Sequence, residues 1–255
     1  MADRSAKCTK PILFSDLLPP IWVDSALAHD LDAMPTYTVP IFLVVLSFPG
    51  PAIPVIDTLN NLIASGDEII KIQAVLSGSL NYVFNNFNSK TSFRSVVQSA
   101  QDHGYTEPDP KIDLSGIDVA RKILILGRES GFKLELKDII NKSFLPKEAL
   151  KTSSNEEFYN AISKNEVYFQ KILKNATKNG TRLKYVAQLE KGKASVGLQE
   201  IESHHDFYNL EGSDNIILFY TSRYRDQPLI VKGAGAGAEV TAGGIFGDII
   251  RIGKQ

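Results

Sequence analysis

From residue 54 onward, apolar residues recur with a spacing that changes repeatedly between the helical and the strand period. Residues 55–64 place their apolar side chains on one helical face, whereas residues 68–76 alternate as a strand does. The strongest helical pattern covers residues 115–129. Several strand patterns follow one another late in the chain. This order predicts an α+β fold in which helices cover a mixed sheet.

The other expected elements come from the same two periods. Further helices are expected at residues 80–87, 93–103 and 238–252, with one or two more within 158–177. Further strands are expected at residues 183–188, 194–200, 216–221 and 229–231. The first fifty residues differ, because six prolines divide them into short pieces. Strand patterns there are limited to short apolar runs at 21–23 and 41–46.

Composition argues against several classes of protein. The net charge of −1 gives no reason to expect nucleic acid or an anionic membrane as a partner. The longest apolar run, residues 39–48, is far shorter than the roughly 20 residues that span a bilayer. The single cysteine, Cys8, cannot form an internal disulfide, and no Cys/His cluster has metal-ligand spacing. We therefore expect a cytoplasmic globular protein, with the His204–His205 pair facing solvent.

The densest group of chemically active side chains lies at residues 104–122. Four carboxylates fall just before or within the first turn of the predicted helix: Glu107, Asp109, Asp113 and Asp118. Asp118 and Lys122 are four positions apart, so their side chains share one helical face. A lysine beside carboxylates is suited to proton transfer, because its surroundings can tune its pKa.

A purely structural interpretation fits the same residues. Ser115 and Asp118 have the spacing of a capping box, Ser-x-x-Asp. The pair formed by Asp118 and Lys122 has the spacing of an ordinary ion pair worth about 0.3–0.5 kcal/mol. Acidic residues near a helix start are also favoured by the helix dipole. The pattern by itself leaves both interpretations open.

Residues 104–122 resemble the signature of the homoserine dehydrogenase family, Gly-Tyr-Thr-Glu-Pro-Asp-Pro followed by Asp-Leu-Ser-Gly-Ile-Asp-Val-Ala-Arg-Lys. Three other segments are similar to the family in order and spacing: residues 53–56, 77–82 and 232–242. The resemblance covers most of the chain, from about Pro54 to Arg251. It favours the chemical interpretation of the carboxylates and the lysine over the structural one.

The resemblance implies a role for each matching residue. Lys122 would be the catalytic lysine that takes the substrate's hydroxyl proton, with Glu107 and Asp118 holding the substrate amine and positioning that lysine. The other implied substrate contacts are Gly78, Ser79, Tyr105 and Asp113. The implied cofactor contacts are Gly235 and Gly237.

The glycine-rich turn at residues 233–238 also matches a loose G-x-G-x-x-A dinucleotide pattern. We do not interpret it as that fingerprint, because no strand pattern follows the helix that it opens to complete a βαβ unit. In the family this turn approaches the cofactor from the C-terminal side. The alternative is a tight turn that lets helix and sheet pack closely.

The resemblance further implies an activity and partners. The reaction would be the NADP- or NAD-dependent interconversion of L-aspartate 4-semialdehyde and L-homoserine in threonine, methionine and isoleucine biosynthesis. A homodimer is implied, and also an aspartokinase domain in a longer protein. The family binds a monovalent metal ion through main-chain oxygens of a Val-Gly-Ala-Gly loop, which is Pro49-Gly50-Pro51-Ala52 here, so no metal ligand can be assigned.

We therefore expect three parts. Residues 1–53 would be a truncated or degenerate remnant of a nucleotide-binding domain, because they are too short for a doubly wound fold. Residues 54–237 would form the substrate-binding, catalytic and dimerisation domain, and residues 238–255 a closing helix that returns toward the N-terminal region. The alternative is a non-catalytic dimerising or substrate-binding remnant of the enzyme.

Overall fold

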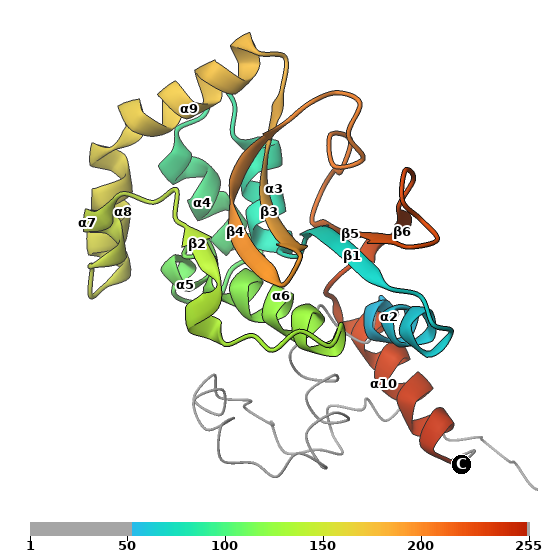
Figure 1. Ribbon diagram of the computed structural model, residues 1–255. Helices are drawn as coiled ribbons and strands as arrows, with labels where there is room; N and C mark the ends of the chain where they lie inside the picture. Colours follow the sequence, from blue (N-terminus) through green and yellow to red (C-terminus); the bar gives the residue numbers. More distant parts are fainter. Residues whose placement is uncertain (1–52, 254–255) are drawn as a thin grey trace, which may run out of the picture. The chain divides into compact units, whose positions relative to one another are not determined.

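A six-stranded sheet organises residues 53–253, the part of the chain that the computed structural model describes (Figure 1). Its strands are β1 (Ile69–Val75), β2 (Ile140–Lys142), β3 (Arg182–Glu190), β4 (Lys193–Ile201), β5 (Asp214–Thr221) and β6 (Leu229–Ala234). Their order across the sheet is β2-β4-β3-β1-β5-β6. Strands β2 and β4 are parallel and the other neighbours are antiparallel. The sheet is therefore mixed, which confirms the predicted α+β class.

Each helix expected between residues 55 and 252 is present. The helices are α2 (Val55–Ala64), α3 (Gly78–Asn86), α4 (Phe93–Asp102), α5 (Pro110–Leu114), α6 (Ile117–Glu129), α7 (Lys147–Leu150), α8 (Asn155–Lys164), α9 (Glu166–Lys178), α10 (Ala238–Gly253) and the 3₁₀ turn η4 (Leu136–Asp138). The pattern at 158–177 resolves into two helices, α8 and α9. The short elements α5, η4, β2 and α7 were not predicted. The expected strands at 21–23 and 41–46 lie outside the described residues.

The two faces of the sheet are buried differently. On one face, inward residues of the central strands join the main core with α2, α3, α4, α6 and α8 (Figure 1). Ile72, Tyr185 and Ile217 are examples, each at most 1% exposed. On the other face, a smaller cluster lies beneath the segment at residues 202–212; its members are Val75, Val186, Ile201, Phe207, Leu210, Ile216 and Leu218. Because side chains alternate between faces along a strand, neighbouring residues of β5 contribute to opposite clusters.

Helix α6 begins in a different way from the one its sequence suggested. Its N-cap residue is Gly116, at φ 74°, which has no side chain, and the Ile117 N–H donates to Ser115 Oγ at 3.3 Å. Ser115 instead ends α5, and its Oγ donates to the carbonyl of Ile112 at 2.7 Å. The capping-box interpretation of Ser115 and Asp118 is therefore wrong. Gly116 allows this turn because glycine adopts positive φ without steric cost, and a Cβ there would lie 1.9 Å from the hydroxyl of Tyr185.

A buried lysine ties the segment before β5 to helix α3. Lys184 is fully buried, and its Nζ donates to Asn81 Oδ1 at 2.9 Å, to Asn85 Oδ1 at 2.6 Å and to the carbonyl of Leu210. Burial lowers the pKa of Lys184 to about 8. The Asn81 amide in turn donates to the carbonyls of Gly212, at 3.2 Å, and Asp214, at 3.1 Å. Since every donor of the lysine is used, residues 210–214 are held firmly against α3.

Candidate active site

The start of helix α3 organises the first half of the site. The side chain of Ser77 caps the helix by accepting from the Leu80 N–H at 3.2 Å. The hydroxyls of Ser77 and Ser79 lie 2.9 Å apart, and Ser79 Oγ donates to Asp113 Oδ1 at 3.0 Å. The second oxygen of Asp113 accepts from the Glu107 N–H at 2.9 Å. This chain of bonds joins α3, α5 and the loop before α5.

The carboxyl of Asp113 is the electrostatic centre of this cluster. Burial raises its pKa above the usual range, and the bonds from the Glu107 N–H and Ser79 oppose that rise. The negative charges of Glu107 and Asp118 raise the pKa further. Glu107 and Asp118 therefore lie close enough to affect the ionisation of Asp113. Three carboxyl groups together favour a cation, such as an ammonium group, nearby.

Lys122 forms the second half of the site. It lies one helical turn after Asp118 on α6, and its Nζ is 2.7 Å from Asp118 Oδ2. The same ammonium donates to the backbone carbonyl of Leu76, at the end of β1, at 3.0 Å. The lysine side chain is 14% exposed and the aspartate 50%. Lys122 is thus fixed at the end of the sheet and open on one side, a geometry that suits proton exchange with a bound molecule.

The remaining predicted substrate contacts lie around this cluster. Tyr105 is 41% exposed and stacks on Tyr82 with ring centroids 4.4 Å apart. Gly78 packs so tightly that a Cβ would lie 2.9 Å from the carbonyl oxygen of Ser213. The lack of a side chain at Gly78 therefore allows the start of α3 to pack closely against the segment before β5.

The glycine-rich turn follows β6 and leads into α10, as predicted. Gly235 is buried and Gly237 is exposed. Gly237 has φ 129°, a conformation that other residues rarely adopt. The turn therefore leaves its backbone uncovered at Gly237, which allows close approach of a flat ligand.

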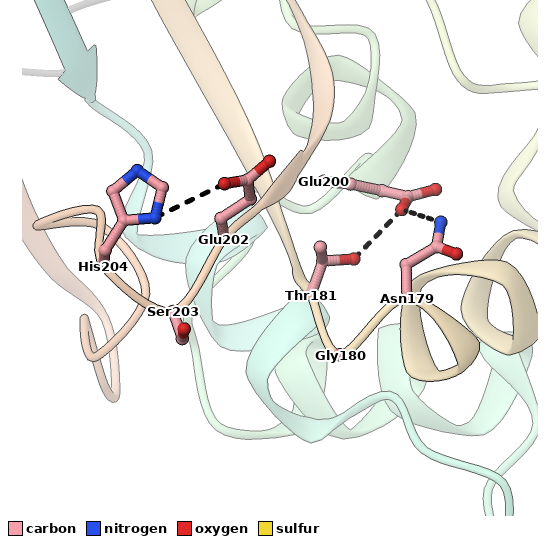
Figure 2. Close-up of a pocket in the computed structure, with 7 residues that line it drawn as sticks. All are labelled: Asn179, Gly180, Thr181, Glu200, Glu202, Ser203 and His204. Carbon is pink, nitrogen blue, oxygen red and sulfur yellow. Dashed lines mark hydrogen bonds and ion pairs between the residues drawn. The ribbon is translucent and has the colours of Figure 1, made fainter.

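The hollow shown in Figure 2 does not include any predicted site residue. Its lining residues are Asn179, Gly180, Thr181, Glu200, Glu202, Ser203 and His204. Glu200 already accepts from Asn179 at 2.9 Å and Thr181 at 3.0 Å, and Glu202 lies 3.3 Å from His204. In the described part of the chain, no group of three or more His, Cys, Asp or Glu side chains is arranged to hold a metal ion. We therefore interpret this hollow as a polar surface whose acidic groups are already paired.

Sequence reasoning missed two parts of the site. The Leu76 carbonyl that holds Lys122 is a backbone group, which has no signature in the sequence. Ser77 was quoted within a matching segment but not recognised as the cap that orients Ser79; a serine directly before a helical pattern was the available signal. Among residues 53–253, no helix has the length and apolar character needed to cross a bilayer.

The fold and this cluster define an α+β domain with a polar, carboxylate-rich site at one end of its sheet. Comparison with known families makes the class specific. The family model for homoserine dehydrogenase matches residues 54–250. The chain belongs to the homoserine dehydrogenase family.

Individual relatives agree with that assignment. A bifunctional aspartokinase/homoserine dehydrogenase 2 of Zea mays is 48% identical over 205 residues, covering 80% of this chain and 22% of the relative. The homoserine dehydrogenase of Schizosaccharomyces pombe is 44% identical, covering 81% of this chain and 57% of the relative. A hyperthermophilic archaeal homoserine dehydrogenase solved with NADPH has a TM-score of 0.57 at 25% identity, covering 78% of this chain and 52% of that one. The chain therefore spans only part of each relative.

Proposed function

We propose that this chain supplies the substrate-binding and catalytic part of a homoserine dehydrogenase. The reaction would interconvert L-homoserine and L-aspartate 4-semialdehyde with a nicotinamide cofactor. The observation that carries the proposal is the position of the Lys122 ammonium. It is held by Asp118 and the Leu76 carbonyl, and Asp118 also acts on the nearby carboxyl of Asp113.

Each proposed role follows from chemistry. Lys122 exchanges a proton with the substrate hydroxyl oxygen, taking it during oxidation of the alcohol and returning it during reduction of the aldehyde. Glu107 and Asp118 attract the substrate ammonium, and Asp118 also orients Lys122. Gly78, Ser79, Tyr105 and Asp113 complete the pocket. Asp113 acts mainly through the bonds that fix Ser79 and the Glu107 backbone.

The described residues fit one part of a nicotinamide cofactor. When bound, that cofactor supplies the hydride acceptor or donor of the reaction. The exposed backbone at Gly237 suits contact with it, and we propose Gly237 and the buried Gly235 of the same turn as cofactor contacts. A pyrophosphate site needs a glycine turn between two parallel strands of a βαβ unit. In residues 53–253 the parallel pair is β2 and β4, which does not flank this turn.

The test is to join the chain to the part of the Schizosaccharomyces pombe relative that it does not cover. We expect this chimera to reduce NADP with L-homoserine, and the chain alone to bind NADPH weakly or not at all and to show no turnover. Absorbance at the NADPH band and calorimetry measure the two quantities. An inactive but folded chimera would favour the alternative, a non-catalytic dimerising or substrate-binding remnant. Tight NADPH binding by the chain alone would show that residues 1–53 were misinterpreted as a remnant.

We also propose that the chain forms a homodimer through its sheet. On the face opposite the main core, Gln73, Gln188 and Ser195 lie side by side across three strands and are only partly buried. These neutral polar side chains can bond to a second copy, with Lys71 and Glu190 lying in register beside them. Sedimentation at micromolar concentration should give the mass of two chains; a monomer would contradict the proposal.

The other parts of the function rest on the relatives. Because several relatives are named as bifunctional with aspartokinase, we propose an aspartokinase domain in the full-length protein. The division at residues 53 and 237, the closing role of α10, a monovalent metal ion and a cytoplasmic location also remain proposals. The plant relatives are named as chloroplastic, so fractionation of the source cell is the measurement for location.

A further inference from the structure

Asn215 is a buried polar side chain that the preceding roles do not use. It lies near the start of β5 with 2% of its surface exposed. Its carboxamide oxygen, Oδ1, is buried and has no hydrogen-bond partner among residues 53–253. A buried acceptor without a partner costs free energy and is rare in native proteins. The position therefore requires an explanation beyond packing.

The sheet shows which way this side chain faces. Asn215 alternates with Ile217 and Phe219 along β5, and those two residues belong to the main core on the helical face. Val75 of β1 pairs with Ile216, so the next position along the two strands brings Leu76 beside Asn215.

On its other side, Asn215 pairs with Gly233 of β6. A Cβ on Gly233 would lie 3.8 Å from Ile53, so this neighbour contributes no polar side chain and is covered by an apolar one. Asn215 therefore lies between Leu76, whose side chain is apolar, and Gly233, which has no side chain. The Oδ1 acceptor is therefore unsatisfied because its strand neighbours cannot donate to it.

The same geometry places Asn215 beside the proposed site. Leu76, its neighbour on β1, provides the carbonyl that holds Lys122 Nζ at 3.0 Å. Gly233, its neighbour on β6, leads into the turn that contains Gly235 and Gly237. Asn215 thus lies between the anchor of the proposed catalytic lysine and the proposed cofactor turn.

The backbone of Asn215 is fixed relative to the substrate loop. The carbonyl of Asp214 accepts from the Asn81 amide at 3.1 Å, and the Ser213 carbonyl lies against Gly78. Ser79, the next residue, is bonded to Asp113. A side chain on so rigid a strand end is preorganised, so a bond that it makes to a ligand costs little ordering entropy.

We infer that Asn215 is a further ligand-binding residue of this site, whose Oδ1 accepts a hydrogen bond from an N–H or O–H group of the bound molecule. The inference rests on the proposed function. Two sources carry such a donor: the amino-acid substrate, through its ammonium or hydroxyl, and the nicotinamide cofactor, through its carboxamide. The bound ligand would then donate the hydrogen bond that Asn215 Oδ1 lacks within the described residues.

The experiment uses the full 255-residue chain and the variant Asn215→Leu, which has nearly the same volume and no polar atoms. L-homoserine and NADPH are titrated separately, and binding is followed by ¹H–¹⁵N NMR, which detects weak complexes. We expect Asn215→Leu to weaken one of the two ligands about tenfold, which identifies the source of the donor. We also expect the melting temperature of the unliganded chain to rise, because an unsatisfied buried acceptor is removed.

Asn81→Leu is the matched control for stability. Asn81 is equally buried but fully bonded, so the same exchange should lower the melting temperature. If Asn215→Leu also lowers it and leaves both ligands unaffected, Asn215 is structural and the inference is wrong.

Asp113→Asn separates the inference from the proposed function. Loss of L-homoserine binding in Asp113→Asn, with both ligands unaffected in Asn215→Leu, would leave the proposed function standing and overturn the inference alone. A wild-type chain that does not bind L-homoserine would overturn the proposed function and, with it, the inference that rests on it.

Discussion

Lys122→Ala is expected to lower kcat of the active chimera by about 10²–10⁴-fold while KM for L-homoserine changes little. The lysine acts on a proton that moves in the transition state, so its loss raises the barrier rather than weakening ground-state binding. Glu107→Ala should instead raise KM as well, because a carboxylate that faces an ammonium acts in both states. Steady-state kinetics beside a melting curve measure these effects.

Lys111→Ala is the matched control for that result. Lys111 is also a partly buried lysine that donates to a backbone carbonyl, that of Thr152, and lies 3.8 Å from a carboxylate, Asp109. It shares the structural features of Lys122 but is bonded to the segment after α7 rather than to the end of β1. We expect Lys111→Ala to change stability slightly and to leave kcat within a few-fold. If Lys122→Ala behaves in the same way, the pair of Lys122 and Asp118 is an ordinary helical ion pair worth about 0.3–0.5 kcal/mol.

The long elements could be predicted because burial imposes a period that the sequence must keep. Helix α6 and strands β3, β4 and β5 each run for eight residues or more, so a repeated apolar pattern identifies them. Helix α7 has four residues and β2 has three, too few to show a period. β2 also forms in an exposed segment, where apolar alternation is not required.

The part of the site that the sequence could predict consists of reactive side chains whose spacing places them on one face of one helix. Asp118 and Lys122 meet as their four-residue separation required. The bond from Ser79 to Asp113 joins positions 34 residues apart, which local patterns do not connect. The start of α6 was misplaced for a related reason: the residue that demands glycine at position 116 is Tyr185, 69 positions away in β3, and no local signal connects the two.

Gly116→Ala is expected to lower the free energy of unfolding by about 2–5 kcal/mol, the sum of an overpacking cost and a left-handed backbone cost. The new Cβ would lie 1.9 Å from the hydroxyl and 2.5 Å from Cζ of Tyr185. That ring cannot move away easily, because it is 1% exposed and its hydroxyl donates to Asn141 Oδ1 at 3.0 Å. Chemical denaturation of the purified chain measures the loss.

Gly131→Ala, at the other end of the same helix, separates the backbone cost from the overpacking cost. Gly131 follows the other end of α6 at φ 87°, and its Cβ would meet nothing within 4 Å. This variant therefore carries the backbone cost alone, about 1–2 kcal/mol. Equal losses at Gly116 and Gly131 would mean that Tyr185 yields to the new methyl group. The larger loss at Gly116 would instead show that the start of α6, and with it the position of Asp118 and Lys122, is set by direct contact with β3.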